Sequence, residues 1–271
     1  MRSLIHRATP PRARALLPGI LLALAPALGG CPITGPKDTP LASCSPPTLT
    51  VGGSVAGNTG EGRCKGTDGQ TGNFFALVLT EQAAVKLTLA GNSFPGYLGF
   101  YTSDGTLIYQ KAAPDALTIP IVLPAGKYLL RVDSKSGADG PFTVSAAPMA
   151  TSGCGDGERF VLRGVTINGA VTSNSCIPGG VLRQEWWILL GWKPGESVSV
   201  TTTVDKPTYE EMRGGDGNPV LTSKNFGPGT WTATVPLAAL SYGNGSYYMT
   251  GLWLFAMSSA NLPITYSLKV E

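Results

Sequence analysis

The feature that most constrains the fold is an order of short apolar segments that occurs twice along the chain. Each copy contains a cysteine pair, an aromatic pair and segments in which apolar and polar residues alternate. This period of two is typical of strands with one buried face. The matched segments of the two copies are 53–55 and 169–171, 74–75 and 186–187, 85–89 and 198–202, 125–132 and 244–249, and 142–145 and 264–270. We therefore predict a tandem duplication of an all-β domain.

Turn residues favour short strands over long helices. The 271 residues include 36 Gly and 22 Pro, well above the average joint share of roughly 12 %. Ser103-Asp104-Gly105 and Lys193-Pro194-Gly195 resemble hairpin turns with Gly at a positive φ. Short strands joined by polar turns are typical of antiparallel sandwiches. We predict two tandem, jelly-roll-like β-sandwiches, at 44–148 and 154–271, after a signal peptide and a short tether.

Four cysteines support the same division of the chain. Cys44 and Cys64 are 20 residues apart, and Cys154 and Cys176 are 22 residues apart. Four cysteines allow three pairings, and the matched spacing favours Cys44–Cys64 and Cys154–Cys176. A zinc site is the alternative, but such sites use shorter spacings between their cysteines. We expect one disulfide in each domain.

The N-terminal segment has the pattern of a bacterial lipoprotein leader. Residues 1–14 are rich in Arg and residues 15–28 are apolar, which predicts a signal peptide over 1–30. Leu28-Gly29-Gly30-Cys31 resembles a lipobox, in which the Cys is lipidated and becomes the new N-terminus. Ordinary secretion with a free Cys31 is the alternative. We expect a lipidated N-terminus and tether over 31–43, and a membrane partner through the lipid.

Charge and histidine content restrict the function. Four of the 20 basic residues precede Cys31, and all 17 acidic residues follow it. The mature chain is therefore close to neutral and lacks the basic surface that nucleic acid requires. The single histidine, His6, also precedes Cys31, which removes the commonest general base from the mature chain. We predict a protein that is not an enzyme, has no cofactor and binds no nucleic acid.

One acidic cluster has residue types that could serve catalysis or metal binding. Glu210, Glu211 and Asp216 lie in the segment 209–218. Adjacent residues of an extended segment point to opposite faces, so Glu210 and Glu211 would not converge as a catalytic pair. We expect a solvated hairpin loop and no catalytic residues. No metal site is predicted; a cation site at Asp216 and Asn218 is the alternative.

The strand and turn motifs resemble the bacterial pre-peptidase C-terminal domain. The segments 98–105 and 124–132 carry the resemblance in the first copy, and 194–200 and 266–270 in the second. This resemblance implies a jelly-roll-like β-sandwich, usually attached to a secreted peptidase and in some relatives ordered by calcium. The positions that are acidic in that family hold at most one carboxylate here, and calcium needs several oxygen ligands. The sequence therefore does not support the calcium site of that family and leaves open whether calcium binds.

All five tryptophans lie in the second copy. Trp186 and Trp187 should point to opposite sides of one strand, so that one can enter the core while the other faces outward. Exposed aromatic rings bind sugar rings or apolar side chains well. The candidate ligand-binding residues are Trp186, Trp187, Trp192, Trp231 and Trp253; packing in the core or between domains is the alternative.

These features together predict a lipid-anchored protein of the bacterial cell envelope, in the outer membrane if the source has one. Pro32 follows the predicted lipidated Cys31, where Asp would often signal retention in the inner membrane. The expected function is non-catalytic binding of a polysaccharide or a protein. The alternative is a structural or assembly subunit that packs permanently against partners in an envelope complex. The sequence leaves the ligand and the oligomeric state open.

Overall fold

The computed structural model describes most of the chain after residue 38. The described residues are 39–61, 63–91, 93–153, 159–176, 183–192, 196–213, 219–236, 248–256 and 262–271. The predicted signal peptide, Cys31 and most of the tether lie outside them. Within the described part, no helix has the length and hydropathy needed to cross a membrane.

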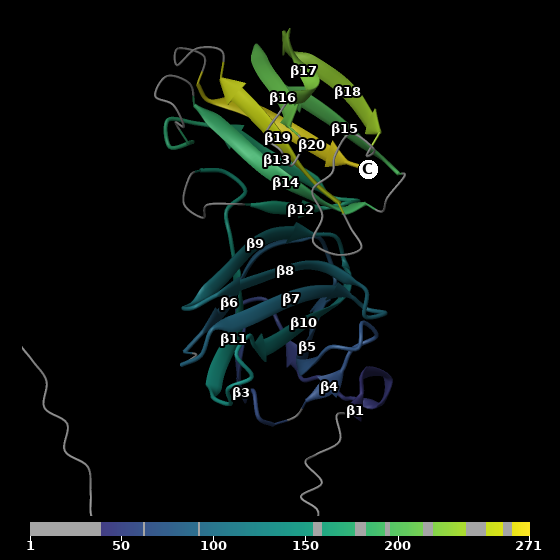
Figure 1. Cartoon of the computed structure of the whole chain (residues 1–271). Helices are drawn as coiled ribbons and strands as arrows, with labels where there is room; N and C mark the ends of the chain where they lie inside the picture. The colour runs from purple at the N-terminus through teal and green to yellow at the C-terminus, as the bar shows by residue number, and fades with distance from the viewer. Residues whose placement is uncertain are drawn as a thin grey trace, which may run out of the picture. The chain divides into compact units, whose positions relative to one another are not determined.

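The described residues form strands and one short 3-10 helix. In the first half these are β1 (Thr39–Pro40), η1 (Leu41–Ser43), β2 (Thr48–Leu49), β3 (Gly53–Asn58), β4 (Cys64–Lys65), β5 (Thr71–Leu79), β6 (Ala83–Ala90), β7 (Gly96–Thr102), β8 (Leu107–Ala113), β9 (Leu117–Leu123), β10 (Gly126–Ser134) and β11 (Pro141–Pro148). In the second half they are β12 (Phe160–Leu162), β13 (Thr166–Val171), β14 (Gln184–Trp192), β15 (Ser197–Val204), β16 (Thr208–Arg213), β17 (Pro219–Phe226), β18 (Gly229–Pro236), β19 (Tyr248–Ala256) and β20 (Ile264–Val270). Figure 1 labels most of these elements.

The two halves have the same strand topology. The first half contains the strand orders β5-β10-β7-β8 and β3-β11-β6-β9. The second half repeats them as β14-β19-β16-β17 and β13-β20-β15-β18. Even the short strands correspond, because β2 pairs in parallel with β5 and β12 pairs in parallel with β14. The all-β class predicted from the sequence is confirmed, and its duplication is present strand for strand.

Each half encloses its own hydrophobic core between two sheets. The first core joins Phe75 and Leu130 of one sheet to Leu87 and Val144 of the other. The second core joins the equivalent strands through residues that include Trp187, Leu189, Val200 and Leu268. Alternation along each strand produces this arrangement, since every second side chain points into the sandwich. Burial of these apolar side chains is the main source of stability.

Strand β12 connects the two halves through a shared sheet. It pairs in parallel with β9 of the first half and with β14 of the second, so that nine strands form one sheet. Phe160 and Leu162 pack in the first core, while Val161 packs in the second. At the matched position of β2, Thr48 is exposed. A polar residue there keeps the outer edge of β2 hydrated, whereas the apolar side chains of β12 join the two cores.

A glycine opposite an aromatic residue marks the same point in both copies. Gly57 is the register partner of Phe142, and Gly169 is the register partner of Tyr266. A Cβ atom at either glycine would lie 2.5 Å from the opposing ring, a distance that no real Cβ tolerates. Gly57 and Gly169 are therefore equivalent positions of the two copies. The sequence alignment of 53–55 with 169–171 had the correct strands but was displaced by four residues.

The Cys44–Cys64 disulfide predicted from the sequence is present, with its Cα atoms 6.3 Å apart. Both cysteines pack in a small third cluster with Phe74, Tyr101 and Leu129, on the face of the first sheet that points away from the first core. Cys176 is also disulfide-bonded. Cys154 lies outside the described residues, so its pairing with Cys176 stays a prediction.

Candidate functional site

The structure separates the five tryptophans into different environments. Trp187 and Trp192 have 0 % of their surface exposed and belong to the second core. They are core residues and are removed from the predicted ligand face. Trp186 and Trp231 are half-buried. Trp253 lies in β19, and its side chain is not among those described.

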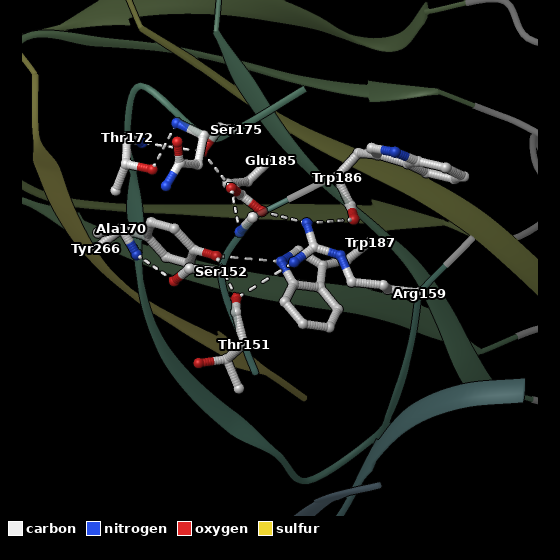
Figure 2. A network of polar contacts seen from close by, with 12 residues as sticks. Thr151, Ser152, Arg159, Ala170, Thr172, Ser175, Glu185, Trp186, Trp187 and Tyr266 are labelled. Atoms are coloured by element: carbon white, nitrogen blue, oxygen red, sulfur yellow. Dashed lines mark hydrogen bonds and ion pairs between the residues drawn. The ribbon is translucent and has the colours of Figure 1, made fainter. Parts of the chain in front are cut away.

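Trp186 and Trp187 leave β14 on opposite sides, as alternation requires. Figure 2 shows the two indoles pointing away from each other. Since Trp187 points into the second core, Trp186 lies on the opposite face of the same sheet, which points away from that core. In register, Trp186 is the partner of Trp253, which is the partner of Glu211. Three neighbouring strands thus place two tryptophan positions and one carboxylate in a single row.

The predicted solvated loop around Glu210 and Glu211 is wrong for these two residues. Both lie in β16, with 1 % and 6 % of their surface exposed. The loop prediction rested on the polar composition of 209–218, whereas pairing of β16 with both β17 and β19 makes this segment an inner strand of the nine-stranded sheet. Asp216 and Asn218, the alternative cation site, lie outside the described residues.

A buried ion pair lies directly beneath the row. Arg159 and Glu185 form a salt bridge with their side chains 3 % and 0 % exposed. Glu185 also accepts hydrogen bonds from the Gly153 backbone N–H, at 2.9 Å, and from the Ser175 hydroxyl. Figure 2 shows these contacts converging on the carboxylate. A buried charge must be paired and hydrogen-bonded, and this carboxylate meets both conditions.

The same ion pair holds Trp187 in place. The Arg159 guanidinium lies 4.4 Å from the centre of the Trp187 ring, within the range of a cation–π contact. On its other side, the Trp187 indole N–H donates to the Tyr266 hydroxyl at 3.3 Å. Burial raises the pKa of that Tyr266 phenol, which stays neutral at all physiological pH values. Glu185 and Trp187, the residues on either side of Trp186 in the chain, are therefore both held in fixed positions by buried polar contacts.

This polar network is specific to the second copy. Asn73 occupies the position of Glu185, and Pro47 occupies that of Arg159: the Pro47 carbonyl accepts from Ala76 as the Arg159 carbonyl accepts from Ile188. Neither Arg159 nor Glu185 was predicted from the sequence as a site residue. The available signal was the position of each charged residue directly beside an apolar strand.

A second buried carboxyl group lies inside the same sandwich. The Thr202 hydroxyl donates to Glu210 Oε1 at 3.0 Å, and both side chains are buried. Burial raises the pKa of the Glu210 carboxyl to about 8, which the Thr202 hydrogen bond only partly opposes. Leu89 and Leu98 occupy the matched positions in the first core.

Metal-binding clusters are missing from the described residues, where no group of three or more His, Cys, Asp or Glu side chains could hold an ion. The arrangement found is a partly exposed aromatic residue on a rigid, internally bonded strand. Such a surface can bind a ligand by stacking and apolar contact.

No protein-family model matches the chain, and no curated protein matches its sequence. The similarity to solved structures is weak, as three examples show. A protein of Eubacterium rectale, provisionally described as secreted, has 10 % identity and a TM-score of 0.24 over 80 % of this chain and 73 % of that one. The N-terminal CBM22-1–CBM22-2 tandem domain of Xyn10C from Paenibacillus barcinonensis has 11 % identity and a TM-score of 0.22 over 81 % of this chain and 90 % of that one.

The third structure, a Parabacteroides distasonis protein also provisionally described as secreted, has 10 % identity and a TM-score of 0.17 over 80 % of this chain and 82 % of that one. These scores are too low to transfer a function. The chain's own topology defines its class: an all-β protein of two tandem β-sandwiches that share one sheet. The resemblance of 98–105 and 124–132 to the pre-peptidase C-terminal domain stays a prediction.

Proposed function

We propose that this protein is a lipid-anchored, non-catalytic binding protein of the bacterial envelope, and that its second sandwich binds a polysaccharide or protein ligand through the face that carries Trp186. One observation carries the proposal. Trp186 is half-buried on a strand whose neighbouring residues, Glu185 and Trp187, are fully buried and bonded. An aromatic ring on such a rigid support loses little entropy when a ligand stacks on it.

The proposed location is supported by the cysteines and the leader. The Cys44–Cys64 disulfide is typical of proteins that fold in oxidising compartments such as the bacterial periplasm. The signal-peptide pattern and the lipobox at 28–31 add an anchor, because acyl chains contribute about 0.8 kcal/mol for each buried CH₂.

The described surface favours reversible binding over permanent packing in an assembly. Subunits of obligate complexes present broad apolar patches. Among the described residues, the exposed large hydrophobic side chains are Val51 and Val78, at 38 % and 47 % exposure. They lie in the first half and are separate residues, whereas the proposed ligand face is in the second half.

We expect the Trp186→Ala variant to bind its ligand about tenfold or more weakly, because loss of an aromatic contact removes about 1.4 kcal/mol or more. Residues 32–271 would be made in an oxidising compartment and applied to an array of glycans, peptidoglycan fragments and envelope or matrix proteins. Val78→Ala is the control, since it removes an exposed apolar side chain from the first half. Equal binding by wild type and Trp186→Ala would refute the proposed face.

We expect Cys31→Ala to release the protein from the membrane fraction, since lipidation needs the thiol. The measurement is fractionation of cells expressing the full chain, with incorporation of labelled palmitate. A Cys44→Ala and Cys64→Ala double variant serves as control, because it removes a disulfide and leaves Cys31 intact. Undiminished membrane attachment of Cys31→Ala would overturn the lipid anchor.

A further inference from the structure

The outer face of the second sandwich's four-stranded sheet is lined by hydroxyl groups. This sheet has the order β13-β20-β15-β18. Val198, Val200, Thr202 and Val204 of β15 are buried, so the alternate residues Ser199, Thr201 and Thr203 point outward. Three pairs of outward side chains are hydrogen-bonded across β15 and β18: Ser199 with Thr234 at 3.3 Å, Thr201 with Thr232 at 3.0 Å, and Thr203 with Thr230 at 2.9 Å.

A groove of about 620 Å³ opens on this face where β13, β20 and the end of β15 meet. Its polar lining comprises Ser152, Asn168, Thr203, Asp205, Thr265 and Ser267. Thr203 belongs to both the groove and the row of paired hydroxyls, so the two features are continuous. Ser152 anchors the rim, since its hydroxyl oxygen accepts from the Ala170 backbone N–H at 3.0 Å.

The charge of the groove restricts what it can bind. Asp205 is the one ionisable side chain on its outward lining; the other ionisable group, the Tyr266 phenol, is buried with a raised pKa and stays neutral. The described lining residues supply one carboxylate and no cation, and the exposed Lys269 further along β20 is paired with Glu271. This charge disfavours an anionic polymer, and one carboxylate is too few for a hard metal ion. Asp205 Oδ1 accepts from the Thr265 backbone N–H at 2.8 Å, which fixes the carboxylate while its second oxygen can accept from a ligand hydroxyl.

We propose that this groove is a binding site for a neutral polysaccharide, separate from the Trp186 face. The inference extends the proposed function to a second surface and a stated ligand class. Hydroxyl, amide and carboxylate groups in the lining match the donors and acceptors of an uncharged sugar chain. Threonine side chains have restricted χ1 rotation, and pairing across the strands orders them further, so little entropy is lost on binding.

The first copy lacks this surface. Its equivalent strands carry Ala90 at the position matched to Thr203 and Pro120 at the position matched to Thr234, as the register of β6 with β11 and β9 shows. Both copies need outward strand residues, yet only the second has hydrogen-bonded hydroxyl pairs at three successive outward positions of the two strands. A general preference of strands for threonine does not account for this difference.

The test uses the Thr203→Val plus Ser267→Ala double variant, which removes the hydroxyls of two residues that are register partners on β15 and β20. Valine keeps the shape and strand preference of threonine. The control is Thr88→Val plus Ser145→Ala, a facing hydroxyl pair on the equivalent two strands of the first copy. Residues 32–271 of each protein, which contain the compact unit Asp38–Glu271, are incubated with amorphous cellulose, chitin and neutral β-glucan, with polygalacturonate as the anionic comparison.

We expect wild type and control to be retained by at least one neutral polysaccharide, and the groove variant to bind it about tenfold more weakly, the loss expected for two hydrogen bonds. Unchanged binding by the groove variant overturns the inference while leaving the Trp186 face to its own test. If wild type binds no neutral polysaccharide, or prefers polygalacturonate, the inference is also overturned; the proposed function is then decided by the protein and peptidoglycan arms of the array.

Discussion

Glu185→Leu is expected to destabilise the second sandwich by about 3–5 kcal/mol, because it leaves the Arg159 guanidinium buried without its counter-charge. The Gly153 N–H and the Ser175 hydroxyl lose their acceptor in the same change. Breaking one partner of a buried pair costs far more than the pair itself contributes. Urea unfolding followed by tryptophan fluorescence measures the change in the free energy of unfolding.

Two further variants make this result specific. Glu196→Leu is the surface control, because Glu196 pairs with Arg163 while both side chains are more than a third exposed, and exposed pairs contribute about 0–1 kcal/mol. The Arg159→Leu plus Glu185→Leu double variant should recover part of the lost stability, since no unpaired charge is left. A Glu185→Leu loss no larger than that of Glu196→Leu would show that Arg159 regains water in the folded protein.

We expect Glu210 to make the protein less stable as the pH rises from about 4.5 to about 8. Burial raises the pKa of the folded carboxyl to about 8, whereas an unfolded glutamate has a pKa of about 4.3. Between these values the folded state holds a proton that the unfolded state has released. The contribution of Glu210 to the free energy of unfolding is therefore fully present below the unfolded pKa. It is lost as the pH rises towards the folded pKa, at up to about 1.4 kcal/mol per pH unit.

Glu210→Gln isolates this contribution, because the amide resembles the protonated acid and still accepts the Thr202 hydrogen bond. The free energy of unfolding of wild type minus that of Glu210→Gln should fall across pH 5–8. Glu81→Gln, at an exposed position of the first half, is the control and should change with pH as wild type does. If the difference in the free energy of unfolding between wild type and Glu210→Gln stays constant over this range, Glu210 is ionised in the folded protein.

Much of the fold could be predicted from local patterns. Alternation at 85–89 and 142–145 identified strands β6 and β11, and the equal spacing of the cysteines identified the Cys44–Cys64 bond. The repeated order of segments was sufficient to predict a duplication. These patterns are local and periodic, and burial on one face of a strand imposes them directly on the sequence.

The candidate site was less accessible to sequence reasoning. Five tryptophans were grouped by composition, yet Trp192 is fully buried and Trp186 is half-buried. Glu210 and Glu211 look like loop residues beside 214–218, which is rich in glycine, but β16 has partners on both sides. Whether a polar residue is buried depends on neighbours that are remote in sequence, such as Thr202 for Glu210.

The sequence by itself determined the all-β class, the doubled order of strands and the disulfide of the first copy, because strand period, turn residues and cysteine spacing are local properties. Only the tertiary structure decided how the copies join and which groups are exposed. Phe160 and Leu162 reach the first core although they belong to the second copy, because β12 has an open edge that fits β9. The ion pair of Arg159 with Glu185 was likewise decided by tertiary structure. The partners of a buried group are set by packing between segments that are distant in sequence, and no local pattern encodes them.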